Sequence, residues 1–176
     1  TPSVLVNAAG INFNKLVPET TAEDFDRVMA VNVRGTFLCS KAACAAMVPR
    51  GIRGRVVNVT SGNYRYVRPG SALYSASKAA MDMLTKGFAL EYGPHGIGVN
   101  AVAPGLVDRP GNTDPNFLAI AGYYRARSAS QRVVTADDVG QAVLFLASSR
   151  AAGMTGEAIV LDGGFSFGRL DFPRRA

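Results

Sequence analysis

The chain has 176 residues, of which 48% are hydrophobic and 18% charged, so it can bury one domain core and lacks the composition of a disordered segment. Its net charge of +6 comes from scattered lysines and arginines, dense only in the C-terminal tail, residues 168–176, so we expect no nucleic-acid partner. No apolar run is long enough to cross a bilayer, and no basic leader precedes the first one, so we expect neither a membrane partner nor secretion.

Four apolar runs along the chain predict buried strands, and helical patterns separate them. The strands are expected over residues 3–10, 55–61, 97–103 and 158–161. Helices are expected from a capping box at Thr20-Thr-Ala-Glu23 through Met47, over 74–93, around 117–127 and from 135 to 146. Buried strands that alternate with helices predict an α/β fold, a parallel sheet covered on both faces, in a single domain over 1–176.

The two cysteines, Cys39 and Cys44, lie on the first predicted helix and do not form a CxxC pair. They predict buried thiols in a reducing compartment, the cytoplasm, and neither a disulfide nor a metal site.

Small and polar residues follow three of the predicted strands. They are the turn Asn7-Ala-Ala-Gly10, Ser61 and Pro104-Gly105. Ligands bind beyond the carboxyl ends of parallel strands, so these residues should share one rim, and Tyr74 follows the second strand after a single loop.

A Tyr and a Lys four residues apart, Tyr74 and Lys78, should lie one turn apart on the same helix face. An ammonium close to a phenol favours the phenolate, so Lys78 is expected to lower the pKa of Tyr74 from its ordinary value of about 10. Taken alone, the pair fits a solvated helix face better than a site, by roughly two to one. The expected convergence of the strand ends is what favours a site.

In their order and spacing these residues resemble the short-chain dehydrogenase/reductase family. The resemblance runs from Val4 to about Ser166 and consists of six motifs: Asn7-Ala-Ala-Gly10, Asn32 within Val-Asn-Val-Arg-Gly, Ser61, Tyr74-x-x-x-Lys78, Pro104-Gly105, and Thr155-Gly156 with Asp162-Gly-Gly164. It implies a Rossmann-like, doubly wound parallel sheet, of which this chain supplies strands 4 to 7. It also implies NAD- or NADP-dependent interconversion of a ketone or aldehyde and an alcohol, as in 3-oxoacyl-acyl carrier protein reductases or sugar and polyol dehydrogenases.

The resemblance also implies a role for each motif. Tyr74 would be the acid/base, Lys78 would bind the nicotinamide ribose, and Ser61 would donate a hydrogen bond to the substrate oxygen. Asn32 would hold a water that links Lys78 to solvent, and its alternative is a structural bond to a nearby backbone carbonyl. The expected cofactor contacts are Asn7, Ala9, Gly10, Tyr74, Lys78, Pro104, Gly105 and Val107.

The sequence departs from the family pattern in two places. Arg109 stands where a Thr usually holds the nicotinamide carboxamide. The strand, Gly-rich turn and helix that hold the pyrophosphate have no counterpart here, and the chain starts without Met, which suggests a piece of something longer. We therefore expect the strand at Val4 to be an apolar sheet edge, and the isolated chain to bind cofactor weakly.

The remaining expectations concern the substrate and partners. Residues 106–131, with Tyr123, Tyr124, Arg125 and Arg127, resemble a substrate lid, and residues 63–66 are expected to line the pocket of a small carbonyl or alcohol substrate. His95 is expected to have no catalytic role. Phe165 and Phe167, with the tail, are expected to pack against a second subunit, giving a dimer or tetramer. The alternatives are a sugar-nucleotide epimerase or dehydratase, and a catalytically silent fragment or binding module.

Overall fold

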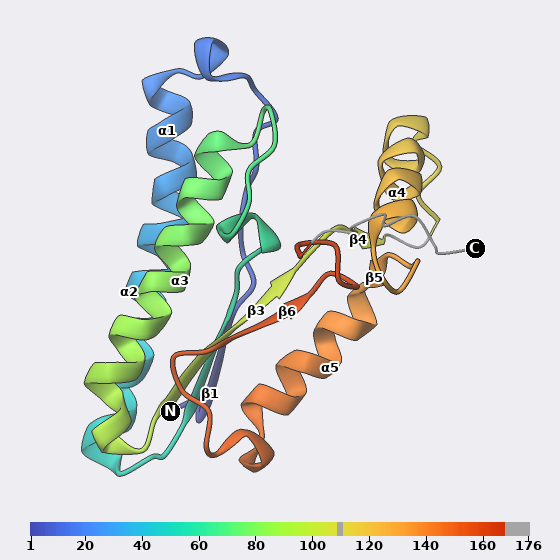
Figure 1. The fold of residues 1–176 in the computed structure, drawn as a ribbon. Helices are drawn as coiled ribbons and strands as arrows, with labels where there is room; N and C mark the ends of the chain where they lie inside the picture. The colour runs from blue at the N-terminus through green and yellow to red at the C-terminus, as the bar shows by residue number, and fades with distance from the viewer. Residues whose placement is uncertain (109–110, 168–176) are drawn as a thin grey trace.

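A four-stranded parallel sheet organises the protein, whose computed structural model describes residues 1–108 and 111–167 (Figure 1). Its strands are β1 (Val4–Asn7), β2 (Arg55–Val59), β3 (Gly98–Pro104) and β6 (Ala158–Leu161), in the order β1-β2-β3-β6. Every neighbouring pair is parallel, and the four predicted strands and the α/β class are confirmed. Arg109 and the tail from residue 168 lie outside the described residues.

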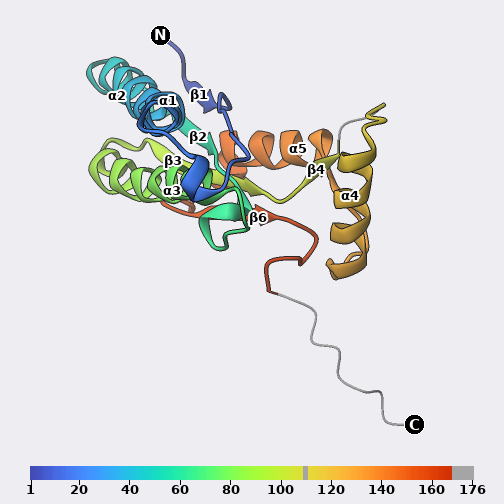
Figure 2. The ribbon, with the colours of Figure 1, turned by 90° about the horizontal axis from the view of Figure 1, so that it is seen from above.

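Helices cover both faces of this sheet. On one face lie α2 (Thr36–Met47) and α3 (Ala72–Tyr92), and on the other lies α5 (Ala136–Ala147) (Figure 2). Successive side chains of a strand point to opposite faces, so Val56 packs with Met47 and Phe88 beneath α2 and α3, whereas Val57 packs with Leu146 of α5. A strand buried on both faces needs apolar residues at successive positions, which is the pattern that β2 carries.

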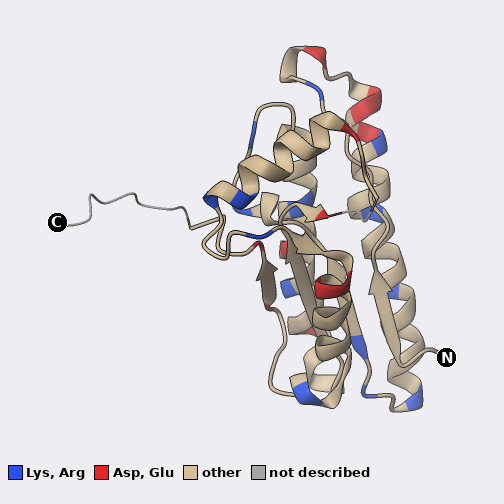
Figure 3. Cartoon of the chain, turned by 90° about the vertical axis from the view of Figure 1, so that its right-hand side faces the viewer, with Lys and Arg blue, Asp and Glu red and all other residues tan. Residues whose placement is uncertain are grey.

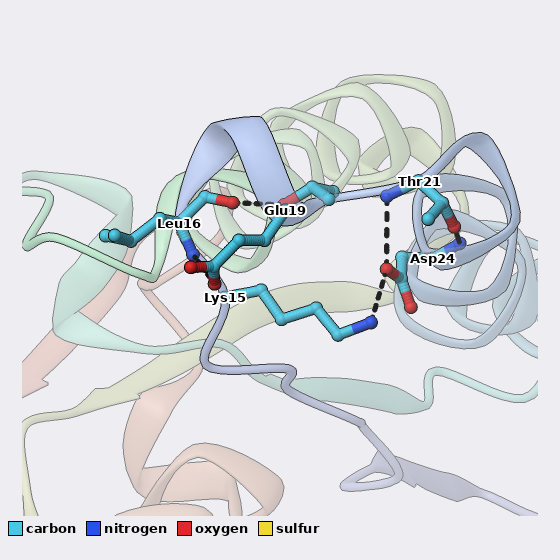
Figure 4. A network of polar contacts seen from close by, with 6 residues as sticks. Lys15, Leu16, Glu19, Thr21 and Asp24 are labelled. Atoms are coloured by element: carbon cyan, nitrogen blue, oxygen red, sulfur yellow. Dashed lines mark hydrogen bonds and ion pairs between the residues drawn. The ribbon is translucent and has the colours of Figure 1, made fainter.

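The first helical stretch runs without a break from α1 (Ala22–Val28) through a π-helical segment, Met29–Gly35, into α2. Its capping box lies one residue later than predicted. Asp24 N donates to Thr21 Oγ1 at 3.2 Å, and Thr21 N donates to Asp24 Oδ2 at 3.1 Å (Figure 4). Asp24 also accepts from Lys15 Nζ at 2.7 Å and so forms an ion pair with it. Glu23, with which the predicted capping box ended, takes no part in this ion pair.

The segment between β3 and α5 stands at the carboxyl ends of the strands. It contains α4 (Pro115–Arg127), close to the predicted helix, and a small parallel pair of β4 (Val107–Asp108) with β5 (Val134–Thr135). Two-residue strands carry no readable periodicity, so this pair was not predicted.

The edge strand and the cysteines refine two expectations. In β1, Val4 is 39% exposed and Val6 is 40% exposed, so the predicted apolar edge is confirmed and full burial of this strand is wrong. Cys44 is buried in the core beneath α2, but Cys39 is exposed, because it lies off the helix stripe that faces the sheet.

Along the described part of the cartoon, short basic and acidic segments are scattered over several elements (Figure 3). Within residues 1–108 and 111–167, no helix is both long and apolar enough to span a membrane.

Candidate active site

A cavity of about 700 Å³ opens at the carboxyl ends of β1, β2 and β3, between α3 and α4. The predicted site residues that line it are Gly10, Ser61, Tyr74, Lys78, Pro104, Gly105 and Val107. The predicted residues that do not line it are Asn7, Ala9 and Asn32. Parallel strands end at one rim, so four segments that are distant in the chain meet around one space.

Ser61 is placed at the end of β2 by the turn that follows it. Its Oγ caps the 3₁₀ turn Gly62–Tyr64 by accepting from Asn63 N at 3.3 Å, which leaves the hydroxyl proton available for donation. The Ser61 hydroxyl also acts on the Tyr74 phenol, whose pKa it lowers by favouring the phenolate.

Tyr74 is nevertheless harder to ionise than an ordinary tyrosine. Burial raises the pKa of Tyr74, and this effect exceeds the opposing influence of the Ser61 hydroxyl and the Arg68 guanidinium. The expectation that Lys78 lowers this pKa is therefore wrong for the protein without ligands. The physical reason is that the phenol is desolvated, while the Lys78 ammonium is directed elsewhere.

Lys78 is 3% exposed and lies beside the Tyr74 ring, with Nζ 5.5 Å from the ring centre. Nζ donates to Val59 O at 3.0 Å and contacts Met81 Sδ at 3.5 Å. Burial lowers the pKa of Lys78 to about 8, because the apolar surroundings disfavour the ammonium. At neutral pH the residue remains mostly charged, with its proton held less tightly than in water.

Asn32 is fully buried in the π-helical segment and ties three parts of the site together. Its Oδ1 accepts from Ile11 N at 2.8 Å, and its Nδ2 donates to Ile11 O and to Ser77 Oγ, both at 3.0 Å. These bonds hold the loop after β1 against α3. The structural alternative is therefore confirmed, since the Asn32 amide donates to a backbone carbonyl, that of Ile11, and the water-relay role stays a prediction.

Gly10 occupies the narrow space between these groups. A Cβ at this position would lie 3.4 Å from both Asn32 Oδ1 and Lys78 Nζ. A glycine therefore lets the turn after β1 pass close to the buried ammonium.

The Asn7 side chain belongs to a buried hydrogen-bond network. Its Nδ2 donates to Ser40 Oγ at 3.0 Å and to Asn58 Oδ1 at 2.8 Å, and Asn58 Nδ2 donates to Thr85 Oγ1 at 2.9 Å. This buried chain of polar groups joins β1 and β2 to α2 and α3. Contacts of Asn7 and Ala9 with a cofactor stay predictions.

Lining residues that the sequence argument missed are Ile11, Asn12, Val59, Thr60 and Arg68. Ala8 lies in the predicted rim turn, and five further lining residues fall within the predicted lid: Leu106, Asn112, Asp114, Phe117 and Ile120. Of the residues expected to line the pocket, Asn63 and Tyr124 do so, Tyr66 lines an adjoining cavity, and Tyr64 and Arg65 line neither. Thr60 adjoins the predicted Ser61, so its position past the strand end was a usable signal. Arg68 lies in an irregular loop, for which the sequence offers no periodicity.

Comparisons with known proteins agree with this geometry. A family model described as enoyl-(acyl carrier protein) reductase matches residues 1–166. A short-chain dehydrogenase/reductase of Armillaria gallica is 43% identical over 172 residues, which are 93% of this chain and 65% of that protein. Carbonyl reductase [NADPH] 2 of Sus scrofa is 38% identical over 166 residues, which are 92% of this chain and 67% of that protein.

A solved structure supports the same assignment. The structure of 4-hydroxyisoleucine dehydrogenase complexed with NADH superposes with a TM-score of 0.88 at 29% identity, covering 96% of this chain and 70% of that one. The chain thus spans about two thirds of the length of the curated relatives it matches.

Proposed function

Because the chain belongs to the short-chain dehydrogenase/reductase family, we propose that it is the catalytic part of an NAD- or NADP-dependent oxidoreductase that interconverts a ketone or aldehyde and an alcohol. The observation that carries the proposal is the meeting of Ser61, Tyr74 and Lys78 at one cavity beyond the strand ends. A sugar-nucleotide epimerase or dehydratase is the less favoured alternative, because the relatives reported above are named as a dehydrogenase and reductases.

The protonation states suit carbonyl reduction. Burial raises the pKa of Tyr74, so its phenol carries a proton at neutral pH and can donate it to a carbonyl oxygen. The Ser61 hydroxyl, with its oxygen already accepting from Asn63 N, can donate to the same oxygen as negative charge develops there. Lys78, with a pKa of about 8, lies beside the phenol with its Nζ 5.5 Å from the ring centre, and its proposed role is to hold the nicotinamide ribose close to Tyr74. In alcohol oxidation each proton moves in the opposite direction.

The residues of the cavity fit the nicotinamide end of a dinucleotide. Two of the three Lys78 ammonium hydrogens have partners, Val59 O and Met81 Sδ, so one remains for a ribose hydroxyl. Pro104, Gly105 and Val107 line the same cavity and would border the ring, and Gly10 leaves room beside the ammonium. When bound, the cofactor supplies or accepts the hydride. The NADH in one solved neighbour and the NADPH in the name of one relative support the cofactor class and leave both forms open.

The substitution Tyr74→Phe tests the proposal. It should lower kcat for reduction of a carbonyl panel with NADH or NADPH by about 10²–10⁴-fold, because the proton donor is lost. Tyr92→Phe, at the far end of the same helix and stacked on Phe88, is the matched control and should retain turnover. Equal turnover of wild type and Tyr74→Phe would remove Tyr74 from its role.

We also propose that a second copy of the chain covers α2 and α3. These helices carry a groove of about 570 Å³ lined by Phe37, Met83 and Phe88, and nearby Leu90 is 81% exposed. Two such apolar faces would bury each other in a dimer or tetramer. Phe165, expected at the subunit contact, also stacks on Tyr124 within the chain, and its contact with a second subunit stays a prediction. Light scattering of Met83→Lys should detect a smaller particle than wild type, and an unchanged mass would reject this interface.

Two further assignments remain proposals. Residues 106–131 act as a substrate lid, supported by the contribution of α4 to the cavity wall. The protein works in a reducing compartment, the cytoplasm, supported by two cysteines that are both free thiols.

A further inference from the structure

A second cavity, of about 690 Å³, adjoins the catalytic cavity and has aromatic walls. Tyr66, Tyr123, Tyr124 and Phe165 line it, and Arg68, Ile120 and Tyr124 line both cavities. The residues shared by the two cavities place the aromatic walls beside the site of Ser61 and Tyr74. A substrate that occupies the catalytic cavity can therefore extend into the aromatic one.

The rings of this second cavity present flat apolar surfaces. Tyr124 stacks on Phe165 with ring centres 4.1 Å apart and planes inclined by 18°. The ring centre of Tyr66 lies 5.8 Å from that of Phe165. The Tyr66 hydroxyl is buried against Gly62, the neighbour of Ser61, where a Cβ would lie 3.1 Å from Oη. Such walls favour a planar or apolar group over a hydrated one.

Arg68 is an exposed residue that lines both cavities and so stands at their junction. Its Nη1 donates to Asn14 Oδ1 at 2.9 Å, which orients the guanidinium. No carboxylate of residues 1–108 and 111–167 forms an ion pair with it. Its positive charge acts on the phenols of both Tyr66 and Tyr74, so it lies within electrostatic reach of the reacting group.

Two acidic residues border this region, and neither forms an ion pair with Arg68. Asp114 lines the catalytic cavity, but its Oδ1 caps α4 by accepting from Asn116 N at 3.0 Å. Both Asp162 oxygens accept from backbone groups, Gly164 N and Ser166 N, at 2.8 Å each. The guanidinium therefore remains the group at the junction that is suited to bind an anion.

We propose that the carbonyl substrate is an aryl or extended apolar keto acid, whose carboxylate is bound by Arg68 and whose apolar arm enters the aromatic cavity. This inference deepens the proposed function and rests on it for the identity of the reacting carbonyl. Arg68 is on this view a specificity residue, which selects the substrate and takes no part in proton transfer.

Calorimetry with matched probes tests the inference. The probes are benzoylformate, 3-benzoylpropionate and 4-benzoylbutyrate, the methyl ester of each, and 4-oxopentanoate, which replaces the ring of 3-benzoylpropionate with a methyl group. At least one aryl acid should bind about tenfold more tightly than its ester, since one charge-assisted contact is lost, and 3-benzoylpropionate should bind more tightly than 4-oxopentanoate. Arg68→Gln should abolish the preference for the acid, and Arg68→Lys should restore part of it.

Arg65→Gln is the matched control, because its guanidinium lies over the Tyr64 ring at 5.1 Å and lines neither cavity. It should keep the full preference. Acid and ester affinities within threefold of each other, no measurable binding of any acid, or equal losses in the two arginine variants would each overturn the inference. Turnover assays, with NADH or NADPH raised until the rate no longer increases, separate the two proposals: selective binding without reduction would then refute the proposed function alone, and reduction of acid and ester with equal KM would refute the inference alone.

Discussion

The buried ammonium of Lys78 offers a quantitative test of the site. Burial lowers its pKa from an ordinary 10.5 to about 8, and each tenfold change in proton affinity is worth about 1.4 kcal/mol. Holding the ammonium charged at pH 7 therefore costs the folded protein about 3 kcal/mol. The hydrogen bond from Nζ to Val59 O offsets this by stabilising the folded protein by about 1 kcal/mol. Lys78→Met keeps the length of the side chain and removes the charge, so it should raise the free energy of unfolding by about 2 kcal/mol at pH 7.

The sign of the pH dependence follows from the lowered pKa. Between about pH 8 and pH 10.5 the unfolded chain holds a proton that folded Lys78 has released, so wild-type stability rises with pH through this window. Lys78→Met lacks this dependence. The free energy of unfolding of Lys78→Met should therefore exceed that of wild type most at or below pH 7, and the difference should disappear by about pH 10.

Urea denaturation of wild type and variant at pH 7 and pH 10 measures both quantities. Lys86→Met is the matched control on the same helix, because Lys86 pairs with Asp82 at 2.7 Å and its side chain is 52% exposed. Its loss should lower the free energy of unfolding, because it leaves the Asp82 carboxylate, whose side chain is only 9% exposed, without its partner, so its effect should be opposite in sign to that of Lys78→Met at pH 7. A Lys78→Met variant that is less stable than wild type at pH 7, or a difference that stays constant to pH 10, would refute the reasoning. The same variant should lose turnover, because the charge beside Tyr74 is gone.

Three other outcomes are expected. Asn7→Ala should lower the free energy of unfolding by about 1–3 kcal/mol in urea denaturation, because it leaves the buried Asn58 side-chain carbonyl without its donor. An unchanged free energy of unfolding would show that this hydrogen bond does not stabilise the core. Val6→Lys should reduce self-association of the chain in light scattering, since Val6 is 40% exposed on the edge strand, and unchanged association would locate the contact elsewhere. Calorimetric titration of the 176-residue chain with NADH or NADPH should find weak binding, and tight binding of either cofactor would contradict this expectation.

The sequence predicted most of the sheet and helices because each carried a local signal. Runs such as Val56-Val57 have a side chain for each face of a buried sheet, and the stretch up to Met47 continues as a helix through a π-helical segment. The convergence of Ser61, Tyr74 and Pro104 on one rim was also predictable, because parallel strands place their carboxyl ends together. The β4–β5 pair was missed because two residues do not make a pattern.

Electrostatic and contact details depended on the fold. The sequence placed Lys78 one helical turn from Tyr74, and from this spacing a lowered phenol pKa followed. The tertiary structure buries both groups and turns the ammonium toward Val59 O, so desolvation governs both pKa values. The contact of Asn7 with a cofactor stays a prediction, whereas its hydrogen bonds to Ser40 and Asn58 depend on the packing of α2 against β1 and β2, which the sequence did not reveal.

The sequence by itself therefore determined the order of the elements, the rim on which they meet and the chemical groups gathered there, because periodicity and strand direction are local properties. Only the tertiary structure decided that the Lys78 ammonium is desolvated and that the Asn7 amide forms internal hydrogen bonds. It also decided that the Arg68 guanidinium lies beside an aromatic cavity. These properties depend on neighbours that are distant in the chain, and no spacing along the sequence encodes them.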